Sequence, residues 1–294
     1  MKRFISFICL IVCTLIWGTT FIAQDTGMDN IGPLTFNSAR FVVGFLTIIP
    51  FAIFFEREKI KIEINSKSKL FIKYLIFMGI SLFLGTFLQQ AALQYTNIAN
   101  AAFFTVFYVP LVPILLFIIY SQKIHWSIWP AIILCVMGVY LLSDFSNSEI
   151  MLGDALVILC SVFWALHIIF AGKFMEEFNI PIFYAALQAL FVATLSIIFS
   201  LIFEEINFSK IILESSSIIY AGALSGGVAF TLQMFAQKNI EEAPAAIIYS
   251  LEGVFAAVAG WIILDQFLDI NNIIGCFLIL IAVISSQLSP SLKN

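Results

Sequence analysis

Glu252 is a carboxyl group in the middle of a long apolar run, and this makes it the residue best placed to do chemistry. The run begins near Ala243, so Glu252 lies about 14 Å along a helix that rises about 1.5 Å per residue. Tyr249 precedes it by about one helical turn and shares its face. A carboxyl group at that depth can bind a proton or a cation, meet a substrate amine, or pair with another charge. The alternative is a protonated or internally bonded glutamate that serves structure.

Arg40 is a second ionisable side chain inside an apolar run. It lies about 10 Å from the start of that run at Pro33. Three roles are open to it: extension to the outer headgroups, pairing with Asp25 or Asp29 as a structural clasp, or contact with a substrate.

His167 shares one helix face with Cys160 and Trp164. Such a histidine is either a satisfied core residue or part of a polar relay. Trp17 and Trp164 both lie away from the ends of their runs, where membrane tryptophans usually sit. They would therefore either line a cavity or pack in the helix core.

Two prolines lie in the apolar run from 98 to 120. Pro110 and Pro113 must kink a helix there and release backbone carbonyls, which could flex or coordinate a ligand. Asn100 opens the same run, broadly on the side that carries Tyr108.

The composition places these residues in a membrane. Of the 294 residues, 62% are hydrophobic and 11% charged, and the mean hydropathy is +1.05, whereas soluble domains carry about a quarter charged residues. The net charge of −4 and the lack of a basic patch argue against nucleic-acid binding. The five cysteines lie in apolar runs without CxxC spacing, so we expect buried thiols and no metal site.

Ten apolar runs come close to the length of about 20 residues that crosses a bilayer. With the amino terminus in the cytoplasm, twelve of the 14 basic residues lie inside, Lys210 lies outside and Arg40 lies within a span. The first run is too long for a cleaved signal, so we expect a retained span and two cytoplasmic termini. The runs cover residues 4–24, 33–55, 70–94, 98–120, 126–143, 152–172, 180–203, 216–237, 243–264 and 270–288.

The second half of the chain repeats the first. Residues 85–142 align without a gap with residues 229–286, at a constant offset of 144. This alignment pairs Tyr108 with Glu252, so polar groups recur at matched positions. Self-similarity at so long a period indicates duplication of a half-protein rather than an array of small units.

An offset of 147 extends the repeat to the start of each half and pairs Trp17 with Trp164. Each half, residues 1–146 and 147–294, holds five spans. Because five is odd, the second half must enter the membrane inverted, which is typical of secondary carriers. We therefore expect an all-α integral membrane protein with ten transmembrane helices, arranged as two inverted five-helix repeats around a central cavity.

Several enzyme and motor motifs are absent from the sequence. There is no GxxxxGK[ST], so this chain encodes no ATP motor. There is no HExxH or GxSxG, which argues against intramembrane hydrolysis or group transfer. We expect no catalytic residues and no cofactor.

Short motifs along both halves resemble the EamA-type family of the drug/metabolite transporter superfamily. Each is weak alone, but their order and the doubled five-helix unit are specific. In the first half they are Trp17-Gly18, Arg40-Phe41, Gln94-Tyr95-Thr96, Asn100-Ala101-Ala102-Phe103 and Tyr108 before prolines. In the second half they are Gly153-Asp154, Trp164, Ala245-Ala246, Leu251-Glu252 and Leu264-Asp265-Gln266.

The resemblance implies two inverted repeats around a cavity and movement of small metabolites across the bacterial inner membrane, often outward. We assign structural or gating roles to Arg40, Asn100, Pro110 and Pro113. The substrate-binding residues that the resemblance implies, with Tyr249 added from helix spacing, are Trp17, Gln89, Tyr108, Trp164, His167, Gln233, Tyr249 and Glu252.

The sequence also departs from the family pattern. Where relatives commonly have Gly-Glu after the fourth and ninth helices, this chain has Ser121-Gln122 and Asp265-Gln266. This puts the usual hinge chemistry in doubt. Where many have Glu-Pro in the ninth helix it has Glu252-Gly253, and glycine would soften the helix there.

Together these observations predict a secondary carrier of a small amphipathic metabolite, such as an amino acid or a derivative, exported across the inner membrane. Aromatic groups would hold its apolar part, and Gln, His and Glu its polar part. Protons are a candidate coupling ion, and the fifth and tenth helices would face either lipid or a second copy in a homodimer. The alternative is a membrane-embedded enzyme or scaffold that acts on lipid intermediates.

Overall fold

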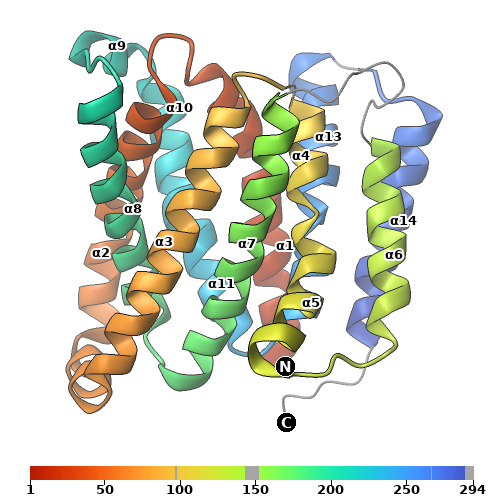
Figure 1. Ribbon diagram of the computed structural model, residues 1–294, viewed down its shortest axis with the longest axis horizontal. Helices are drawn as coiled ribbons and strands as arrows, with labels where there is room; N and C mark the ends of the chain where they lie inside the picture. The colour runs from red at the N-terminus through yellow and green to blue at the C-terminus, as the bar shows by residue number, and fades with distance from the viewer. Residues whose placement is uncertain (97, 143–151, 266, 289–294) are drawn as a thin grey trace.

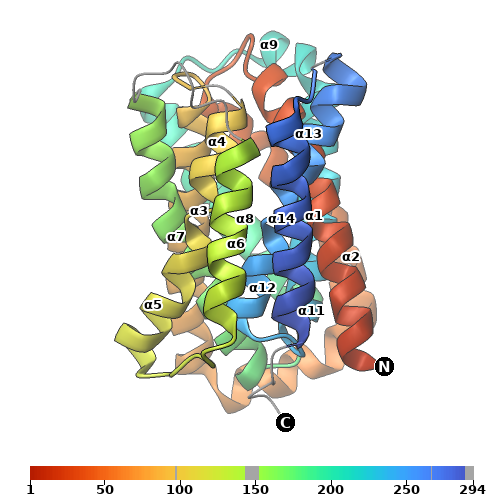
Figure 2. The same ribbon diagram turned by 90° about the vertical axis from the view of Figure 1, so that its right-hand side faces the viewer.

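The computed structural model shows a bundle of helices that run side by side (Figures 1 and 2). It describes residues 1–96, 98–142, 152–265 and 267–288, and every regular element within them is a helix. Nine helical segments of this described part are long and apolar enough to cross a membrane, and a shorter apolar helix covers residues 128–142. The expected fold class, an all-α integral membrane protein, is confirmed.

Each of the ten expected spans corresponds to one helix or to helices joined end to end. The first five are α1 (Lys2–Thr26), α2 (Pro33–Ser66), α3 (Ser68–Ala92), α4 (Ile98–Thr105) with α5 (Tyr108–Tyr120), and α6 (Ile128–Leu142). The second five are α7 (Leu152–Glu177), α8 (Pro181–Phe203), α10 (Ser215–Ile219) with the π-helix η2 (Tyr220–Ala229) and α11 (Phe230–Gln237), α12 (Glu242–Tyr249) with α13 (Leu251–Leu264), and α14 (Ile270–Leu288). The expected boundary at residues 146 and 147 lies outside the described residues.

Two features of the helices differ from the expectation. α2 continues to Ser66, past the expected end at residue 55, through a segment rich in Glu, Lys and Arg. These residues are good helix formers, so the helix continues beyond its apolar part. A short helix α9 (Phe208–Leu213) precedes α10, and the Asn207 side chain accepts bonds from the backbone of its first turn.

The described chain begins and ends at the same end of the bundle. α1 starts and α14 finishes at the lower end in Figures 1 and 2. We call this end the N-terminal face and the opposite end the distal face. α2 and α8 form one side of the bundle and α6 and α14 the other, with the remaining spans between them (Figure 1).

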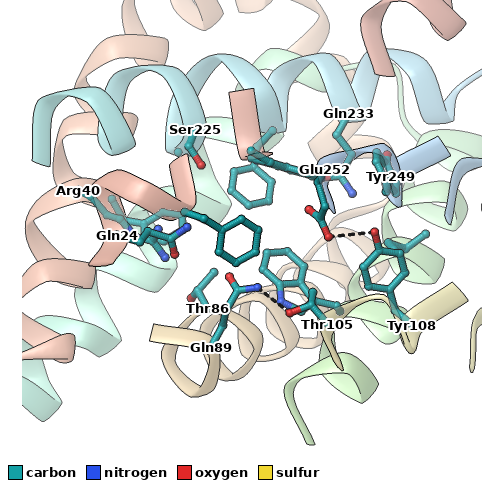
Figure 3. A pocket seen from close by; sticks show the side chains of 17 residues that line it. Gln24, Arg40, Thr86, Gln89, Thr105, Tyr108, Ser225, Gln233, Tyr249 and Glu252 are labelled. Atoms are coloured by element: carbon teal, nitrogen blue, oxygen red, sulfur yellow. Dashed lines mark hydrogen bonds between the residues drawn. The ribbon is translucent and has the colours of Figure 1, made fainter. Parts of the chain in front are cut away.

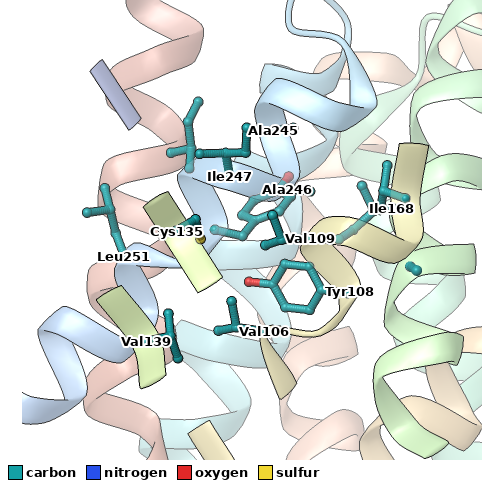
Figure 4. Close-up of a cluster of buried hydrophobic side chains, with 14 of the residues drawn as sticks. Val106, Tyr108, Val109, Cys135, Val139, Ile168, Ala245, Ala246, Ile247 and Leu251 are labelled. Atoms are coloured by element: carbon teal, nitrogen blue, oxygen red, sulfur yellow. The ribbon is translucent and has the colours of Figure 1, made fainter. Parts of the chain in front are cut away.

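A buried apolar cluster fills the space between α5, α6, α12 and α13 (Figure 4). It includes Tyr108 and Val109 of α5, Cys135 of α6, and Ala246 and Leu251 from the second half. The small side chains allow the helices to approach closely, as is common between membrane helices. The chain is therefore tightly packed where α4 gives way to α5 and where α12 gives way to α13.

Matched positions of the two halves share unusual backbone conformations. α4 ends at Thr105 and α12 ends at Tyr249, 144 residues later. Ser121 and Asp265, also 144 apart, end α5 and α13 with φ of 53° and 51°, which are left-handed values that favour glycine. Ser121 and Asp265 thus adopt a conformation that favours glycine although neither is a glycine. The neighbouring Gln266 lies outside the described residues.

Two glutamates cap helices reciprocally on one side of the bundle. Glu204, just after α8, accepts bonds at the start of α2: from the backbone N of Leu34 and of Thr35, both at 2.8 Å, and from Thr35 Oγ1 at 2.6 Å. Glu56 of α2 accepts bonds at the start of α8, from the N of Ile182 at 3.2 Å and of Phe183 at 2.8 Å. The first turn of a helix has free N–H groups and a positive dipole end, so each carboxylate stabilises the other helix.

Removal of one reciprocal cap should destabilise the bundle. We expect Glu204→Ala to lower the free energy of unfolding by about 1–2 kcal/mol, because three donors at the start of α2 lose their acceptor. Thermal unfolding of the purified protein in detergent measures this. The exposed neighbour Glu205 provides a control, since Glu205→Ala should leave the midpoint unchanged. Equal losses in both variants would contradict the capping role.

Position 121, at the end of α5, has a left-handed backbone conformation and should therefore favour glycine over serine. We expect Ser121→Gly to raise the free energy of unfolding by about 0.5–1 kcal/mol, since glycine adopts a positive φ without a Cβ clash. Ser121→Ala removes the same hydroxyl but keeps a Cβ, so it should bring no gain. A gain for alanine as large as that for glycine would show that loss of the hydroxyl is the cause.

Candidate functional site

A cavity lies at the centre of the bundle between helices of both halves (Figure 3). Its volume is about 40 Å³. One water needs about 10–15 Å³, so this conformation has room for a few waters. The lining residues are Trp17, Phe21, Gln24, Arg40, Phe41, Thr86, Gln89, Thr105, Tyr108, Trp164, Ile168, Ser225, Gly226, Phe230, Gln233, Tyr249 and Glu252.

The structure brings most of the predicted site residues together around this cavity. Seven of the eight predicted substrate-binding residues line it: Trp17, Gln89, Tyr108, Trp164, Gln233, Tyr249 and Glu252. Arg40, predicted to be structural or gating, also lines it. Their contact with a substrate stays a prediction.

Glu252 and Tyr108, which the repeat aligns with each other, meet at the cavity wall. Tyr108 Oη donates to Glu252 Oε1 at 3.1 Å, and both side chains are buried. α1 passes α13 so closely here that a Cβ on Gly18 would lie 2.6 Å from the backbone oxygen of Glu252. Because α1 and α13 are so close, Trp17, the residue before Gly18, lines the same cavity as Glu252.

Aromatic rings form much of the remaining wall. The Trp17 ring lies 6.2 Å from that of Trp164, 5.2 Å from that of Phe230 and 5.4 Å from that of Tyr249, between centroids. Trp164 and Phe230 are nearly parallel, with 8° between their planes. The two tryptophans aligned by the repeat are therefore in contact, and both line the cavity instead of only packing in the core.

Arg40 is held inside the bundle by a neutral partner. Its Nε and Nη2 donate to Asn37 Oδ1 at 3.0 and 2.8 Å, and its guanidinium lies 5.0 Å from the Phe41 ring centroid. The side chain is 4% exposed, so it does not extend to the headgroups. Within the described part of the chain it forms no ion pair, so the clasp with Asp25 or Asp29, one of the three roles left open by the sequence, is absent.

Several polar atoms at the cavity have no hydrogen-bond partner among the residues that the structure describes. They are Gln24 Oε1, Trp164 Nε1, Gln233 Oε1 and Tyr249 Oη. Buried polar groups are nearly always satisfied, so these atoms are suited to bind waters or a ligand. Gln89 is different, because its Nε2 donates to Thr105 Oγ1 at 3.1 Å.

His167 does not line the cavity. Its Nε2 lies 3.0 Å from Gln188 Oε1 of α8, and its ring lies 6.0 Å from that of Trp164 and 5.8 Å from that of Phe230. His167 therefore sits behind two lining rings and can position them, but it does not reach the cavity. Its spacing from Trp164 puts the two residues one turn apart on α7, whereas its partner Gln188 lies on α8 and is known only from the tertiary structure.

Asn100, Pro110 and Pro113 also lie away from the lining. Asn100 is buried in α4. Pro110 and Pro113 belong to α5, and the helix break lies just before them, at residues 106 and 107. The break sets the direction of α5 and thereby places Tyr108 at the cavity.

Two residues important to the site were not singled out from the sequence. Gln24 lines the cavity from the last turn of α1, and Asn37 holds Arg40. The spacing of Asn37 and Arg40, three residues apart on one helix, was the available signal. Gln24 had no such signal, because a polar residue near a helix end is expected to face water.

The chain is similar to known transporters along its whole length. Residues 4–144 and 151–286 each match the EamA-like transporter family. A protein of Archaeoglobus fulgidus, named an uncharacterized transporter, is 31% identical over 97% of this chain and 86% of its own length. The uncharacterized transporter YoaV of Bacillus subtilis is 24% identical over 92% of each chain.

One solved crystal structure has the same fold. It covers 96% of this chain and 96% of its own, with a TM-score of 0.73 and 15% identity. The helices, the shared fold and the two family matches agree, and the chain belongs to the EamA-like transporter family of the drug/metabolite transporter superfamily.

Proposed function

We propose that this membrane transporter is a secondary carrier that exports a small amphipathic metabolite, such as an amino acid or a derivative, across the plasma membrane. The observation that carries the proposal is one central cavity with a buried carboxyl group, Glu252, beside packed aromatic rings. The rings would hold the apolar part of the metabolite, and the polar atoms without protein partners would hold the rest.

Glu252 is the residue we assign to proton or amine binding. It lies just after the break between α12 and α13, and Oε1 accepts a single side-chain bond, from Tyr108. Oε2 accepts no bond from the described residues, so it can take a proton or a substrate N–H. A buried carboxyl group with a free oxygen is suited to alternate between two ligands during a cycle.

The position of the cavity supports a carrier over an enzyme that acts on lipid intermediates. The lining polar groups come from the middle of several spans instead of gathering at one face. We place both termini in the cytoplasm, because the basic residues concentrate toward the N-terminal face. The matched helix breaks support two inverted repeats that rock about the cavity.

A charged pair joins α7 and α12 at the N-terminal face of the bundle. Lys173 Nζ of α7 lies 3.7 Å from Glu242 Oε1 of α12, and 5.6 Å from the Tyr120 ring centroid at the end of α5. Glu242 is completely buried. We propose that this Lys173–Glu242 pair is a latch that must open when the carrier exposes its cavity to the N-terminal face.

Neutralisation of Glu252 should remove coupling. In vesicles that contain purified protein, we expect wild type to move at least one member of a panel of labelled amphipathic metabolites. Glu252→Gln should lose the part of transport driven by a pH gradient, because an amide cannot carry the proton. Glu205→Gln, the same change at an exposed site, should behave as wild type. Undiminished gradient-driven transport by Glu252→Gln would refute the site assignment.

Loss of the latch should favour opening at the N-terminal face. In Lys173→Met or Glu242→Gln, we expect a cysteine placed at Gln233 to react about fivefold faster with a thiol reagent supplied from that face, if the pair contributes about 1 kcal/mol. Lys67→Met breaks the exposed Lys67–Glu177 pair at the same face and should have no effect. Additive effects in the Lys173→Met/Glu242→Gln double variant would show that the two residues act separately.

A further inference from the structure

We infer that Arg40 and Glu252 are the two charged ends of one elongated binding site, and that the cargo carries an anionic group and a cationic group at opposite ends of an apolar body. The inference rests on the proposed function and narrows its substrate class. It separates α-amino acids, whose two charges share one carbon, from molecules whose charges lie far apart.

The first observation is that Arg40 lacks an anion. A buried cation in a membrane protein is costly and normally pairs with a carboxylate. A guanidinium has five N–H groups, and only two bonds, both to Asn37 Oδ1, involve this side chain among the described residues. Because Arg40 lines the cavity, its remaining N–H groups are available to an anion that enters there.

The second observation is that the guanidinium is fixed before any ligand arrives. Asn37 Nδ2 donates to Ser196 Oγ of α8 at 3.0 Å and to Thr86 Oγ1 of α3 at 3.3 Å. The amide that orients Arg40 is thus held by two further helices. A pre-oriented planar guanidinium suits a carboxylate, whose two oxygens can accept parallel bonds.

Gln24 adds a second polar group at this end of the cavity. Its side-chain amide forms no hydrogen bond with the described residues, and it lines the same cavity as Arg40, on the same side of the view in Figure 3. An amide N–H₂ can donate to the same carboxylate. Arg40 and Gln24 together form the anionic subsite.

The opposite end of the cavity offers groups that can accept hydrogen bonds. Among the described residues, one carboxyl oxygen of Glu252 has no donor, and Gln233 Oε1 and Tyr249 Oη have no hydrogen-bond partner. The three side chains lie together, opposite Arg40 and Gln24, in Figure 3. An ammonium group has three N–H donors and could satisfy all three.

The two ends are held apart by the fold. α2, which carries Arg40, and α13, which carries Glu252, do not pack against each other. α2 packs on η2, η2 on α1, and α1 on α13. Arg40 and Glu252 form no ion pair, and aromatic rings lie between them in Figure 3. A molecule that satisfies both ends must therefore reach across an apolar middle.

Two isomers test this directly. 6-Aminohexanoic acid and norleucine contain the same atoms, but the first has its amine at the far end of the chain and the second beside the carboxylate. Uptake of each labelled isomer would be measured in vesicles that contain the full-length protein. We expect the half-saturation concentration of 6-aminohexanoic acid to be at least tenfold lower, because norleucine leaves one charged end of the cavity unmatched.

A variant then assigns the carboxylate end. Arg40→Gln should raise the half-saturation concentration of 6-aminohexanoic acid by about 10- to 100-fold, as expected for loss of hydrogen bonds to a charged group. Binding of hexylamine, which has no carboxylate, should stay unchanged when followed by thermal shift. Arg57→Gln makes the same substitution on the exposed end of α2 and should change neither.

The outcomes separate the two proposals. Equal use of both isomers, or preference for norleucine, overturns the elongated site and leaves the carrier function standing. Movement of other amphipathic metabolites but of neither isomer also overturns it. If wild type moves no metabolite of any kind, the carrier function itself fails. The isomer comparison uses wild type alone, so it remains decisive even if Arg40→Gln does not fold.

Discussion

The hydrogen bond from Tyr108 to Glu252 is the contact on which the arrangement of the bundle's centre depends. It joins the two halves at positions that are 144 residues apart and that the repeat aligns. Each partner follows a helix break, so the chain direction on both sides of the contact is set by local backbone geometry. A carboxyl group can remain at this depth only where a donor and a cavity accompany it, and the two breaks provide both.

The outer helices give this centre a fixed frame. α2 and α8 hold each other through Glu56 and Glu204, whose carboxylates replace the side-chain caps that neither helix has at its own N-cap position. Capping of the free N–H groups stabilises the first turn of each helix, so α2 and α8 can move together as one rigid unit. The Lys173–Glu242 pair is of a different kind, because it joins α7 and α12, which both contribute residues to the cavity wall, and we propose that it separates during a cycle.

The charges of the cavity are unusual for the interior of a membrane protein. Arg40 is bonded to an amide and Glu252 to a phenol, although an ion pair between them would be the cheaper arrangement in a low-dielectric interior. η2 and α1 keep them apart. The structure thus leaves the Arg40 guanidinium and the Glu252 carboxyl group without an ion-pair partner among the described residues, which is the arrangement expected where a ligand completes the site.

The sequence by itself determined the class of the protein, its ten spans and seven of the residues that line the cavity. Hydropathy identifies membrane segments because the bilayer requires about 20 apolar residues per crossing. The repeat then matched Trp17 with Trp164 and Tyr108 with Glu252, and polar residues within spans are few enough to be named individually. Only the tertiary structure decided that His167 bonds to Gln188, that Arg40 bonds to Asn37, and that Glu204 caps α2. The physical reason is that spacing along a helix defines which residues share a face, whereas the rotation of that face depends on the packing of neighbouring helices.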